Sequence, residues 1–433
     1  MKKMGSMRSQ ERGKLAYSRM GNQITDPIIT QLMVEALSKP DLLSLAAGFT
    51  DNHVLPVNLV NNVVRNLSRR TEDTEYLQYG LNQGRLLLRE LTCQLLATYP
   101  GEVGKEFNPE QILITNGSQQ ALYLAIQVLC DPGDLILVER PTYFVFLEML
   151  KSLGVEAISI PTDEDRGINF EQFAAMIEAI SVSSKRERLK GIYLVSYFSN
   201  PSSRCMPEED KSRLGRLLQS LDFSLPVIED TAYRELYYDD PYPSRSILSL
   251  PEYEGIPCLY TGTYTKPFAT GLKVGFAYSS DYEWLKKMEC VKGCQDFGTS
   301  NFTQAIIESV LNNDLYPEVL SGLRKHYKRK MKVLQDSLDV YGLRDLGWDW
   351  EIPKGGLLCW IKGSININTN IDSSFCKSCV DHGVLYVPGS ICFAGDEPTY
   401  YVRLSIGSLD EEHLQEAVKR FVEVVKRYYQ HNL

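Results

Sequence analysis

Short runs of apolar residues alternate with longer amphipathic stretches between Ile112 and Ala277. The apolar runs predict buried strands at Ile112–Thr115, Leu135–Val138, Ala157–Ile160, Gly191–Val195, Val227–Glu229, Leu259–Thr261 and Val274–Ala277. Helix-length segments lie between several of them, at Gln119–Cys130, Phe170–Ile180 and Pro207–Leu221. Strands that are apolar throughout and alternate with helices predict an α/β fold, with a mainly parallel sheet covered on both faces.

The pattern changes after Asn301. A long helical stretch reaches about Val340, and short strand candidates follow at Leu357–Ile361 and Tyr401–Leu404. The last stretch repeats its apolar residues at helical spacing, and Ser408 with Glu411 predicts a capping box at its start. These elements predict a smaller α+β domain.

The chain length favours two domains, because 433 residues exceed what one hydrophobic core usually organises. We predict a large domain over residues 51–310 and a small domain over residues 311–433. Residues 1–50 show no core of their own, so we expect them to pack on the small domain or on a partner subunit.

Composition and charge exclude several classes of protein. The chain has 43% hydrophobic and 23% charged residues, and its formal net charge of −9 disfavours binding to nucleic-acid backbones. No apolar run approaches the roughly 18 residues that a membrane span needs. The basic segment Met1–Met20 lacks both the apolar core of a secretory signal and a clear transit-peptide pattern. We therefore predict a cytoplasmic protein without nucleic-acid or membrane partners.

The ten cysteines raise the question of a metal site or disulfides. Cys376 and Cys379 have zinc-like spacing, and Cys290 and Cys294 form another close pair. Neither pair has a matching second pair nearby, and the five histidines are scattered. Reduced thiols in or near the core are the simpler interpretation, so no metal is expected.

A turn, Asn116-Gly117-Ser118, joins the first predicted strand to a helix that begins near Gln119. Free N–H groups at such a helix start favour an anion, and Gly117 lets the backbone approach it closely. A plain capping turn is the alternative. Tyr143 follows the second strand, where it can stack on an aromatic ligand or cover the sheet edge.

Asp230 ends the apolar run Val227–Glu229, and Tyr233 follows three residues later. A carboxylate at a buried strand end is costly unless a positive group meets it, and a protonated pyridine nitrogen is one such group. A helix cap is the alternative interpretation of this aspartate.

Lys266 lies in a loop rich in threonine, glycine and proline between two apolar strands. A lysine that forms a Schiff base needs such a desolvated setting, because a lowered pKa frees its nucleophilic amine. Thr263, Thr265 and Lys273 can supply donors to one phosphate. Considered alone, a surface lysine is the more frequent explanation of such a residue.

In this order and at these intervals the four motifs resemble the fold type I, class I/II aminotransferases that depend on pyridoxal 5′-phosphate. The subgroup that they resemble acts on α-aminoadipate, aromatic or branched-chain amino acids. The resemblance runs from roughly Ser44 to Val424 and includes the landmarks Pro353–Gly356 and Val387–Ser390. It implies a homodimeric enzyme of amino-acid metabolism or biosynthesis that moves an amino group between an L-amino acid and a 2-oxo acid.

The resemblance also implies roles for single residues. Lys266 matches the lysine that carries the cofactor as a Schiff base, and Asp230 matches the partner of the pyridine nitrogen. Tyr233 and Asn200 match the groups that bond the cofactor's 3′-oxygen, and Tyr143 matches the aromatic ring stacked on the cofactor.

Further matches concern the phosphate and the substrate. Gly117, Ser118 and Gln119 match the phosphate-binding turn, with Thr263, Thr265 and Lys273 near it. Tyr79 resembles the tyrosine that reaches a neighbouring subunit's phosphate. Arg403 resembles the arginine that clamps the substrate α-carboxylate, and Asn200 and Gly48 are expected beside the substrate.

Several positions depart from the family pattern. The usual Asn-Pro-Thr-Gly ends here in Ser202 and Ser203, and Lys273 replaces an arginine, so it cannot form a bidentate fork. Thr30 and Ala47 replace an arginine and a glycine near the family's substrate entrance. The resemblance therefore leaves the substrate open, and with it the question of whether these changes alter the reaction.

Two alternatives remain. The same fold and cofactor also support lyases, β-eliminases and oxidases that act on amino acids. A cofactor-sensing module of a transcription regulator is the second, but only some forty residues precede Leu43, too few for a DNA-binding domain.

Overall fold

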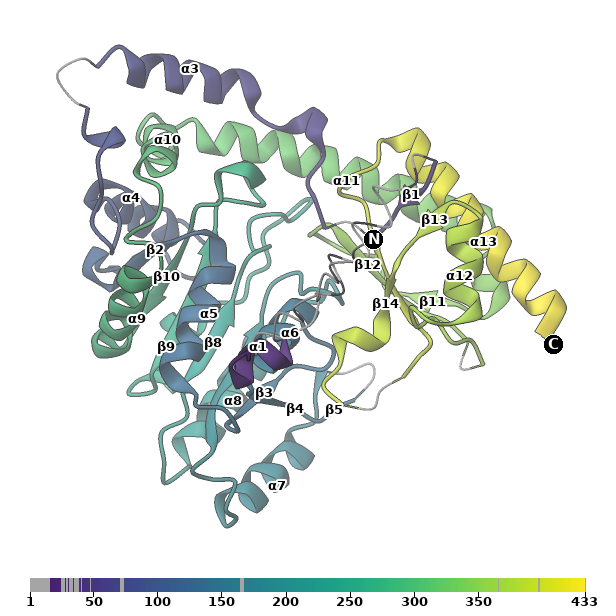
Figure 1. The fold of residues 1–433 in the computed structure, drawn as a ribbon, viewed down its shortest axis with the longest axis horizontal. Helices are drawn as coiled ribbons and strands as arrows, with labels where there is room; N and C mark the ends of the chain where they lie inside the picture. Colours follow the sequence, from purple (N-terminus) through teal and green to yellow (C-terminus); the bar gives the residue numbers. More distant parts are fainter. Residues whose placement is uncertain are drawn as a thin grey trace, which may run out of the picture.

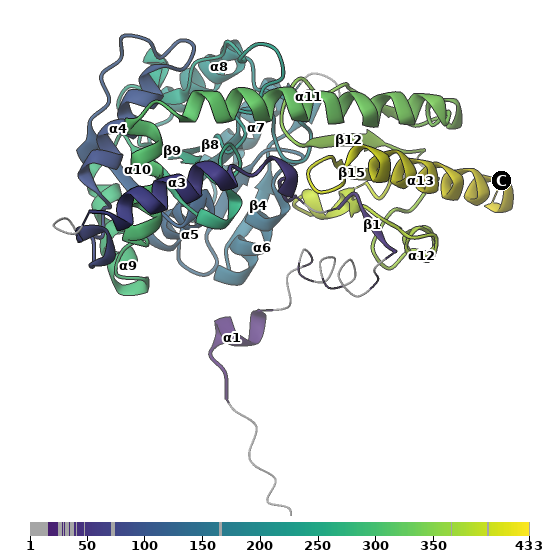
Figure 2. The same ribbon diagram turned by 90° about the horizontal axis from the view of Figure 1, so that it is seen from above.

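The computed structural model describes residues 16–24, 28, 30, 34, 39, 41–46, 48–70, 74–163, 167–364, 366–395 and 398–432. Ala47 and most of the predicted N-terminal segment lie outside the described residues. Two bodies lie side by side, one around a large sheet and one around a small sheet, and the long helix α11 (Tyr316–Val340) runs along both (Figure 1 and Figure 2).

The large sheet has seven strands in the order β2-β10-β9-β8-β7-β3-β4. Their bounds are Ile112–Thr115 (β2), Gly275–Ser279 (β10), Cys258–Thr263 (β9), Val227–Asp230 (β8), Leu189–Val195 (β7), Leu135–Val138 (β3) and Glu156–Ser159 (β4). Only β10 runs antiparallel to its neighbours, and every other adjacent pair is parallel. The predicted α/β fold is confirmed, and all seven predicted strands are present with small shifts at their ends.

Helices cover both faces of this sheet because alternate residues of each strand point to opposite sides. In β3, Ile136 and Val138 pack with α5 (Gly117–Leu129), α6 (Phe144–Leu153) and α9 (Tyr282–Gln295). Leu135 and Leu137 pack on the other face with α7 (Phe170–Ser181) and α8 (Glu208–Gln219). The helices α3 (Val57–Ser68), α4 (Leu86–Ala97) and α10 (Asn301–Asn312) complete this body near β2.

The small sheet is antiparallel throughout, in the order β11-β12-β15-β14. Its strands are Asp349–Trp350 (β11), Leu358–Lys362 (β12), Tyr401–Ser405 (β15) and Val387–Pro388 (β14). Helices α11, α12 (Ser374–Asp381) and α13 (Glu411–Asn432) pack with it. Two short ladders remain, β1 (Leu43–Ser44) parallel to β13 (Val384–Leu385) and the hairpin of β5 (Thr162–Asp163) and β6 (Gly167–Ile168). Helix α1 spans Arg19–Gln23. The exact domain boundaries stay predictions.

The predicted start of the last helix is wrong. α13 begins at Glu411, and the Asp410 carboxylate caps it by accepting from the His413 N–H at 2.8 Å. The Ser408 hydroxyl instead donates to the Ser44 carbonyl at 3.3 Å. Aspartate and serine both cap helices well, and here the contact with β1 occupies the serine hydroxyl.

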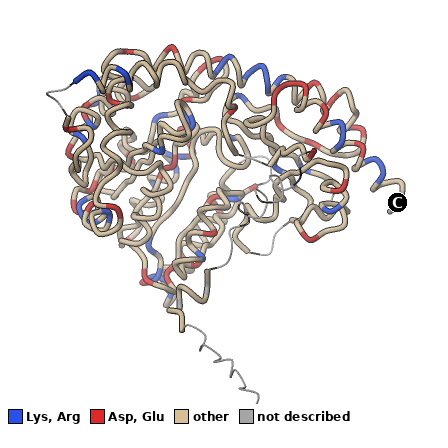
Figure 3. The backbone as a smooth tube through the Cα atoms, turned by 45° about the horizontal axis from the view of Figure 1, so that its top comes forward, with Lys and Arg blue, Asp and Glu red and all other residues tan. Residues whose placement is uncertain are grey.

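Lys and Arg positions are interspersed with Asp and Glu positions along the backbone (Figure 3). None of the helices in the described ranges is long and apolar enough to cross a membrane. All ten cysteines are free thiols, and Cys290 and Cys294 are exposed on α9, whereas Cys376 and Cys379 are buried on α12. Across the described ranges, no three His, Cys, Asp or Glu side chains are grouped as metal ligands.

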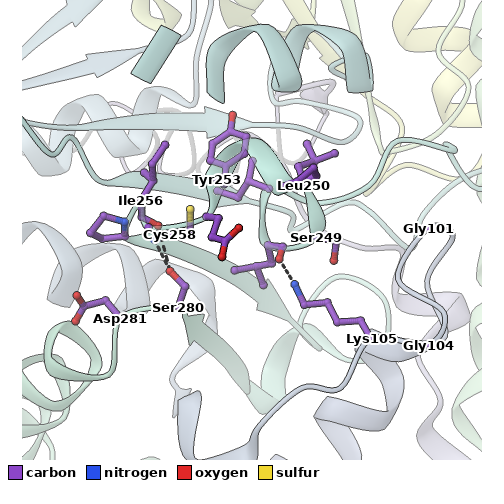
Figure 4. Close-up of a pocket in the computed structure, with 16 residues that line it drawn as sticks. Gly101, Gly104, Lys105, Ser249, Leu250, Tyr253, Ile256, Cys258, Ser280 and Asp281 are labelled. Carbon is purple, nitrogen blue, oxygen red and sulfur yellow. Dashed lines mark hydrogen bonds between the residues drawn. The ribbon is translucent and has the colours of Figure 1, made fainter. Parts of the chain in front are cut away.

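One pocket opens where β9 begins and β10 ends (Figure 4). Cys258 and Ser280 line it, together with Lys105, whose ammonium donates to the Leu248 carbonyl. This pocket lies at the amino end of β9, whereas the predicted lysine motif follows the carboxyl end of the same strand. The pocket is therefore separate from the candidate site.

Candidate active site

Strands β3, β7, β8 and β9 are parallel, so their carboxyl ends share one edge of the large sheet. A predicted site residue lies at or just beyond each end. Tyr143 follows β3, Asn200 follows β7, Asp230 ends β8 and Lys266 follows β9. The topology thereby brings together side chains that are far apart in the sequence.

Asp230 is buried, and two donors hold its carboxylate. The Tyr193 hydroxyl donates to Oδ2 at 2.9 Å, and the Ala232 N–H donates to Oδ1 at 3.0 Å. Burial raises the pKa of Asp230 to about 6, although both hydrogen bonds oppose that rise. Within the described part of the chain, no lysine or arginine forms an ion pair with Asp230. A charged carboxylate therefore faces the site and suits a positive group on a ligand.

Lys266 is partly buried, and its ammonium donates to the carbonyl of Gly48. Burial, together with the nearby charges of Arg403 and Lys273, lowers the pKa of Lys266 to about 8. A much larger fraction of this amine is neutral near physiological pH than is usual for lysine. The geometry and the pKa therefore suit a nucleophile and general base.

Arg403 comes from β15 of the small sheet and is only 2% exposed. Its guanidinium donates to Asn200 Oδ1 at 3.1 Å and to the Ala46 carbonyl at 2.7 Å. The Nε of Arg403 is buried without a hydrogen-bond partner in the described part of the chain. This arginine therefore has donor capacity for an anion at the junction of the two bodies.

The phosphate-binding turn predicted at Gly117 lies beside β9 and β10. Gly117 has a φ of +71°, and its carbonyl accepts from the Thr115 hydroxyl at 2.9 Å. The hydroxyls of Thr263 and Thr265 lie 2.5 Å apart, and a Cβ on Gly117 would come within 3.5 Å of the latter hydroxyl. Two threonine hydroxyls and a helix start thus meet at one place, as the sequence predicts.

Gly275 sets how closely β10 approaches this turn. It is paired with both Thr115 and Thr263, and a Cβ at Gly275 would lie 2.6 Å from the Gly117 carbonyl carbon and 2.7 Å from Ser118 N. Contacts this short are prohibitive, so only glycine permits the observed packing. The sequence analysis did not identify this residue, although its place in a strand beside the lysine loop is a usable signal.

The other predicted residues differ in exposure. Tyr233 is buried and Tyr143 is partly buried, whereas Gln119 is exposed on the first turn of α5. Burial raises the pKa of Tyr143, and the positive charge of Arg403 opposes that rise. Tyr79 is 78% exposed, and its ring packs edge-on against Phe297.

The comparisons with known proteins decide the family. Residues 40–421 match the family model described as aminotransferase class I and II. The chain belongs to this family. Among its relatives, aromatic-amino-acid aminotransferase 1 of Thermococcus litoralis is 28% identical over 91% of this chain and 90% of its own length. A 2-aminoadipate transaminase of Thermus thermophilus is 27% identical over 95% of this chain and 96% of its own length.

The solved structures agree. An α-aminoadipate aminotransferase from Thermus thermophilus, complexed with N-(5′-phosphopyridoxyl)-L-leucine, has a TM-score of 0.80 and 27% identity, covering 96% of this chain and 98% of that chain. The chain is therefore a pyridoxal 5′-phosphate-dependent aminotransferase that acts on amino acids and oxo acids. The alternative of a lyase, eliminase or oxidase is not favoured.

The residues of this aminotransferase fit its cofactor. Asp230 is a buried carboxylate without a cationic partner among the described residues, which suits a protonated ring nitrogen. Two glycines shape the turn at Gly117: Gly117 itself has a left-handed φ of +71°, and Gly275 lies too close to the turn to carry a side chain. A lysine with a lowered pKa lies near both.

A cluster around Asp51 was missed by sequence reasoning. Its buried carboxylate accepts from Lys330 Nζ at 2.9 Å and from the His53 N–H at 2.9 Å, and lies 3.0 Å from His326 Nε2. Burial alone would raise the pKa of Asp51, but these donors hold it well below its usual range. The cluster fixes the chain just after Gly48, whose carbonyl meets Lys266. No local pattern marks such a long-range contact.

Capture of the cofactor by the cofactor-free aminotransferase should depend on pH through Lys266. Only the neutral amine attacks an aldehyde, and the pKa of Lys266 is lowered to about 8. The rate of Schiff-base absorbance growth should therefore rise with pH through an inflection near 8, instead of above about 10 as for an ordinary lysine. A rate that stays flat from about pH 7 to about pH 9 would contradict this assignment.

Removing the hydroxyl that holds Asp230 should weaken cofactor binding most at acidic pH. Tyr193→Phe deletes a donor that lowers the pKa of Asp230, so this carboxyl should stay protonated to a higher pH. Affinity measured by titration should fall roughly tenfold near pH 6.5 and much less near pH 8.5. Tyr253→Phe is the matched control, since its buried hydroxyl donates to the Lys211 carbonyl instead. Identical pH dependence in Tyr193→Phe and wild type would refute the role of this bond.

Proposed function

We propose that Lys266, Asp230 and Arg403 form the reacting centre of this aminotransferase. The observation that carries the proposal is their arrangement: a lysine of lowered pKa and a buried carboxylate lie on one sheet edge, facing a buried arginine from the small sheet. These are the three charges that transamination requires: an amine to bind and move a proton, an anion for the ring nitrogen and a cation for the substrate carboxylate.

The side chains around this centre orient the two ligands. In this proposal Arg403 and Asn200 would hold the α-carboxylate of an L-amino acid and so would fix the orientation of the bonds at Cα. Tyr143 covers the ring face, and Tyr233 with Asn200 bonds the ring 3′-oxygen. Burial raises the pKa of Tyr233 to about 12, so this phenol stays protonated and donates.

The phosphate is assigned to the turn at the start of α5. The N–H groups of Gly117, Ser118 and Gln119 are the proposed donors, with the hydroxyls of Thr263 and Thr265 and the ammonium of Lys273. Lys273 has a left-handed φ of 56° and contributes charge without the paired donors of an arginine. We expect the cofactor to bind despite this replacement.

Proton transfer falls to Lys266. The bound cofactor acts as an electron sink for the substrate. The Lys266 amine would carry the proton taken from Cα of the substrate to the former aldehyde carbon of the cofactor, across the substrate nitrogen, while Asp230 would keep its negative charge beside the ring nitrogen. Gly48 lies against the lysine and is proposed to line the substrate position.

Half-reactions test this function. With an L-amino acid, the aminotransferase should convert its cofactor to stable pyridoxamine phosphate and release one equivalent of 2-oxo acid. The absorbance change of the cofactor is measured for each amino acid in a panel of donors. Lys266→Ala should lose turnover and the Schiff-base absorbance, because the amine that binds the aldehyde is gone. Lys332→Ala is the control, since that lysine is exposed and pairs with Asp336 at 2.8 Å.

Two results would contradict the proposal. The first is a Lys266→Ala protein that retains both turnover and the absorbance. The second is consumption of the amino acid without pyridoxamine phosphate, which would indicate elimination or oxidation. Arg403→Ala should instead raise the KM for the amino acid while leaving the Schiff base intact.

We also propose that the aminotransferase is a homodimer. Large apolar side chains are exposed close to Tyr79 in the sequence, at Leu77, Leu81, Leu86 and Leu87, and the exposed Phe297 packs against the Tyr79 ring. A cluster of this kind favours burial by a partner. A second copy would also bring Tyr79 to the neighbouring phosphate, the role that the family resemblance implies.

A charge placed in this surface should separate the subunits. Leu81 is 67% exposed, so Leu81→Asp should leave the fold intact but shift the mass measured by light scattering from dimer to monomer. Cofactor affinity should fall with it, because Tyr79 no longer reaches the partner's site. Val182→Asp is the control, since Val182 is 85% exposed at the end of α7, outside this surface. A monomeric wild type, or a dimeric Leu81→Asp protein, would refute the proposed interface.

A cytoplasmic location is the third part of the proposal. It is supported by ten cysteines that form no disulfide, as expected in a reducing compartment.

A further inference from the structure

Helix α9 ends at Asp296, beside the start of α5, where the phosphate turn lies. The Asp296 carboxylate receives two hydrogen bonds from that turn. Asn116 Nδ2 donates to Oδ2 at 2.8 Å, and Gln120 Nε2 donates to the same oxygen at 2.7 Å. Gln120 in turn accepts from the Asn116 N–H through Oε1 at 2.8 Å. Asp296 therefore touches both polar side chains that flank residues 117–119.

The remaining contacts of Asp296 fix the carboxylate itself. Lys292 Nζ lies 2.8 Å from Oδ1 and 2.7 Å from Oδ2, and the lysine side chain is fully buried. The Gly298 N–H donates to Oδ1 at 2.9 Å. Every one of these neighbours is a donor, so a neutral amide at position 296 cannot satisfy them all.

The contact between Asn116 and Asp296 affects the start of α5, where an anion would bind. Asn116 is the N-cap residue of α5, a position where asparagine usually accepts from an N–H of the first turn. Here it makes no side-chain cap, and its amide points to Asp296 instead. The N–H groups of the first turn are therefore not occupied by their own cap.

We propose that Asp296 is a positioning residue for the cofactor phosphate. By drawing the Asn116 side chain away from the start of α5, it keeps the first-turn N–H groups available to the phosphate. Lys292 neutralises the carboxylate, so the anion at position 296 does not repel the anion in the turn. This inference rests on the proposed phosphate site at residues 117–119.

The experiment compares two ligands that differ only in the phosphate. The full-length protein is stripped of cofactor, and its affinities for pyridoxal 5′-phosphate and for pyridoxal are measured by absorbance titration. Asp296→Asn alone would leave Lys292 buried and unpaired, which risks unfolding. The test variant is therefore Lys292→Met with Asp296→Asn, which removes both charges together.

In the double variant the affinity for pyridoxal 5′-phosphate should fall about tenfold, while the affinity for pyridoxal stays unchanged. Adding Asn116→Ala should restore most of the loss, because no side chain then competes for the first-turn N–H groups. Asn116→Ala in the wild-type background should bind both ligands nearly as the parent does.

The control is Asp281→Asn at the other end of the same helix. The Asp281 carboxylate caps α9 by accepting from the Trp284 N–H at 2.8 Å, and asparagine can keep this bond, so the change removes a charge from the same helix without touching the phosphate turn. It should leave the ratio of the two affinities unchanged.

Three results would overturn the inference: an unchanged affinity in the double variant, an equal loss for both ligands, or a loss that Asn116→Ala does not restore. A wild-type protein that binds pyridoxal as tightly as pyridoxal 5′-phosphate would instead show that the phosphate site is wrong, and the inference would fall with it.

Discussion

The charge at the end of β8 constrains the structure around it. A strand buried on both faces presents alternate residues to opposite sides, and β8 ends in two consecutive acids. Each acid therefore needs a partner on its own face. Glu229 meets the buried Lys211 of α8 at 2.9 Å, whereas among the residues that the structure describes Asp230 meets neutral donors, from Tyr193 and Ala232. One acid is paired with a lysine within the protein, and the other is left for the positive group of a ligand, which we propose is the ring nitrogen of the cofactor.

This asymmetry explains how a sheet of ordinary apolar strands becomes a site. Removing Lys211 would leave Glu229 as an uncompensated buried charge. The lysine on that face is therefore needed for the stability of the folded protein. On the opposite face, hydrogen bonds alone keep the pKa of Asp230 near 6 despite its burial. The carboxylate remains ionised at neutral pH without an internal cation that would compete with the ligand.

The sequence was sufficient for the fold because the strands of the large sheet are nearly all apolar and their spacing leaves room for helices. Lys266, Asp230 and the turn at Gly117 could be proposed from the sequence because each lies at or just after the end of an apolar run, and because their order and intervals resemble one family. Tyr193 escaped notice because a tyrosine in a buried strand looks like any other core residue. Asp296 and Asp51 act on segments far away in the chain, and one sequence carries no record of such contacts.

The departures from the family pattern also gain a physical meaning. Ser203 holds a left-handed φ of 56° where the family has glycine, which costs about 1 kcal/mol. Its hydroxyl donates to the Leu358 carbonyl of β12 at 2.6 Å, a bond that glycine cannot make and that offsets this cost. β12 pairs with β15, the strand of Arg403.

The loop of Asn200 is consequently fastened to the small sheet twice, once through the side chains of Asn200 and Arg403 and once through Ser203 and the backbone of β12. If the small sheet moved relative to the large one, either both connections would break or the loop of Asn200 would move together with the small sheet. Ser203 is not among the proposed substrate contacts. Its bond to β12 therefore holds Asn200 near Arg403 without occupying any N–H donor of Arg403.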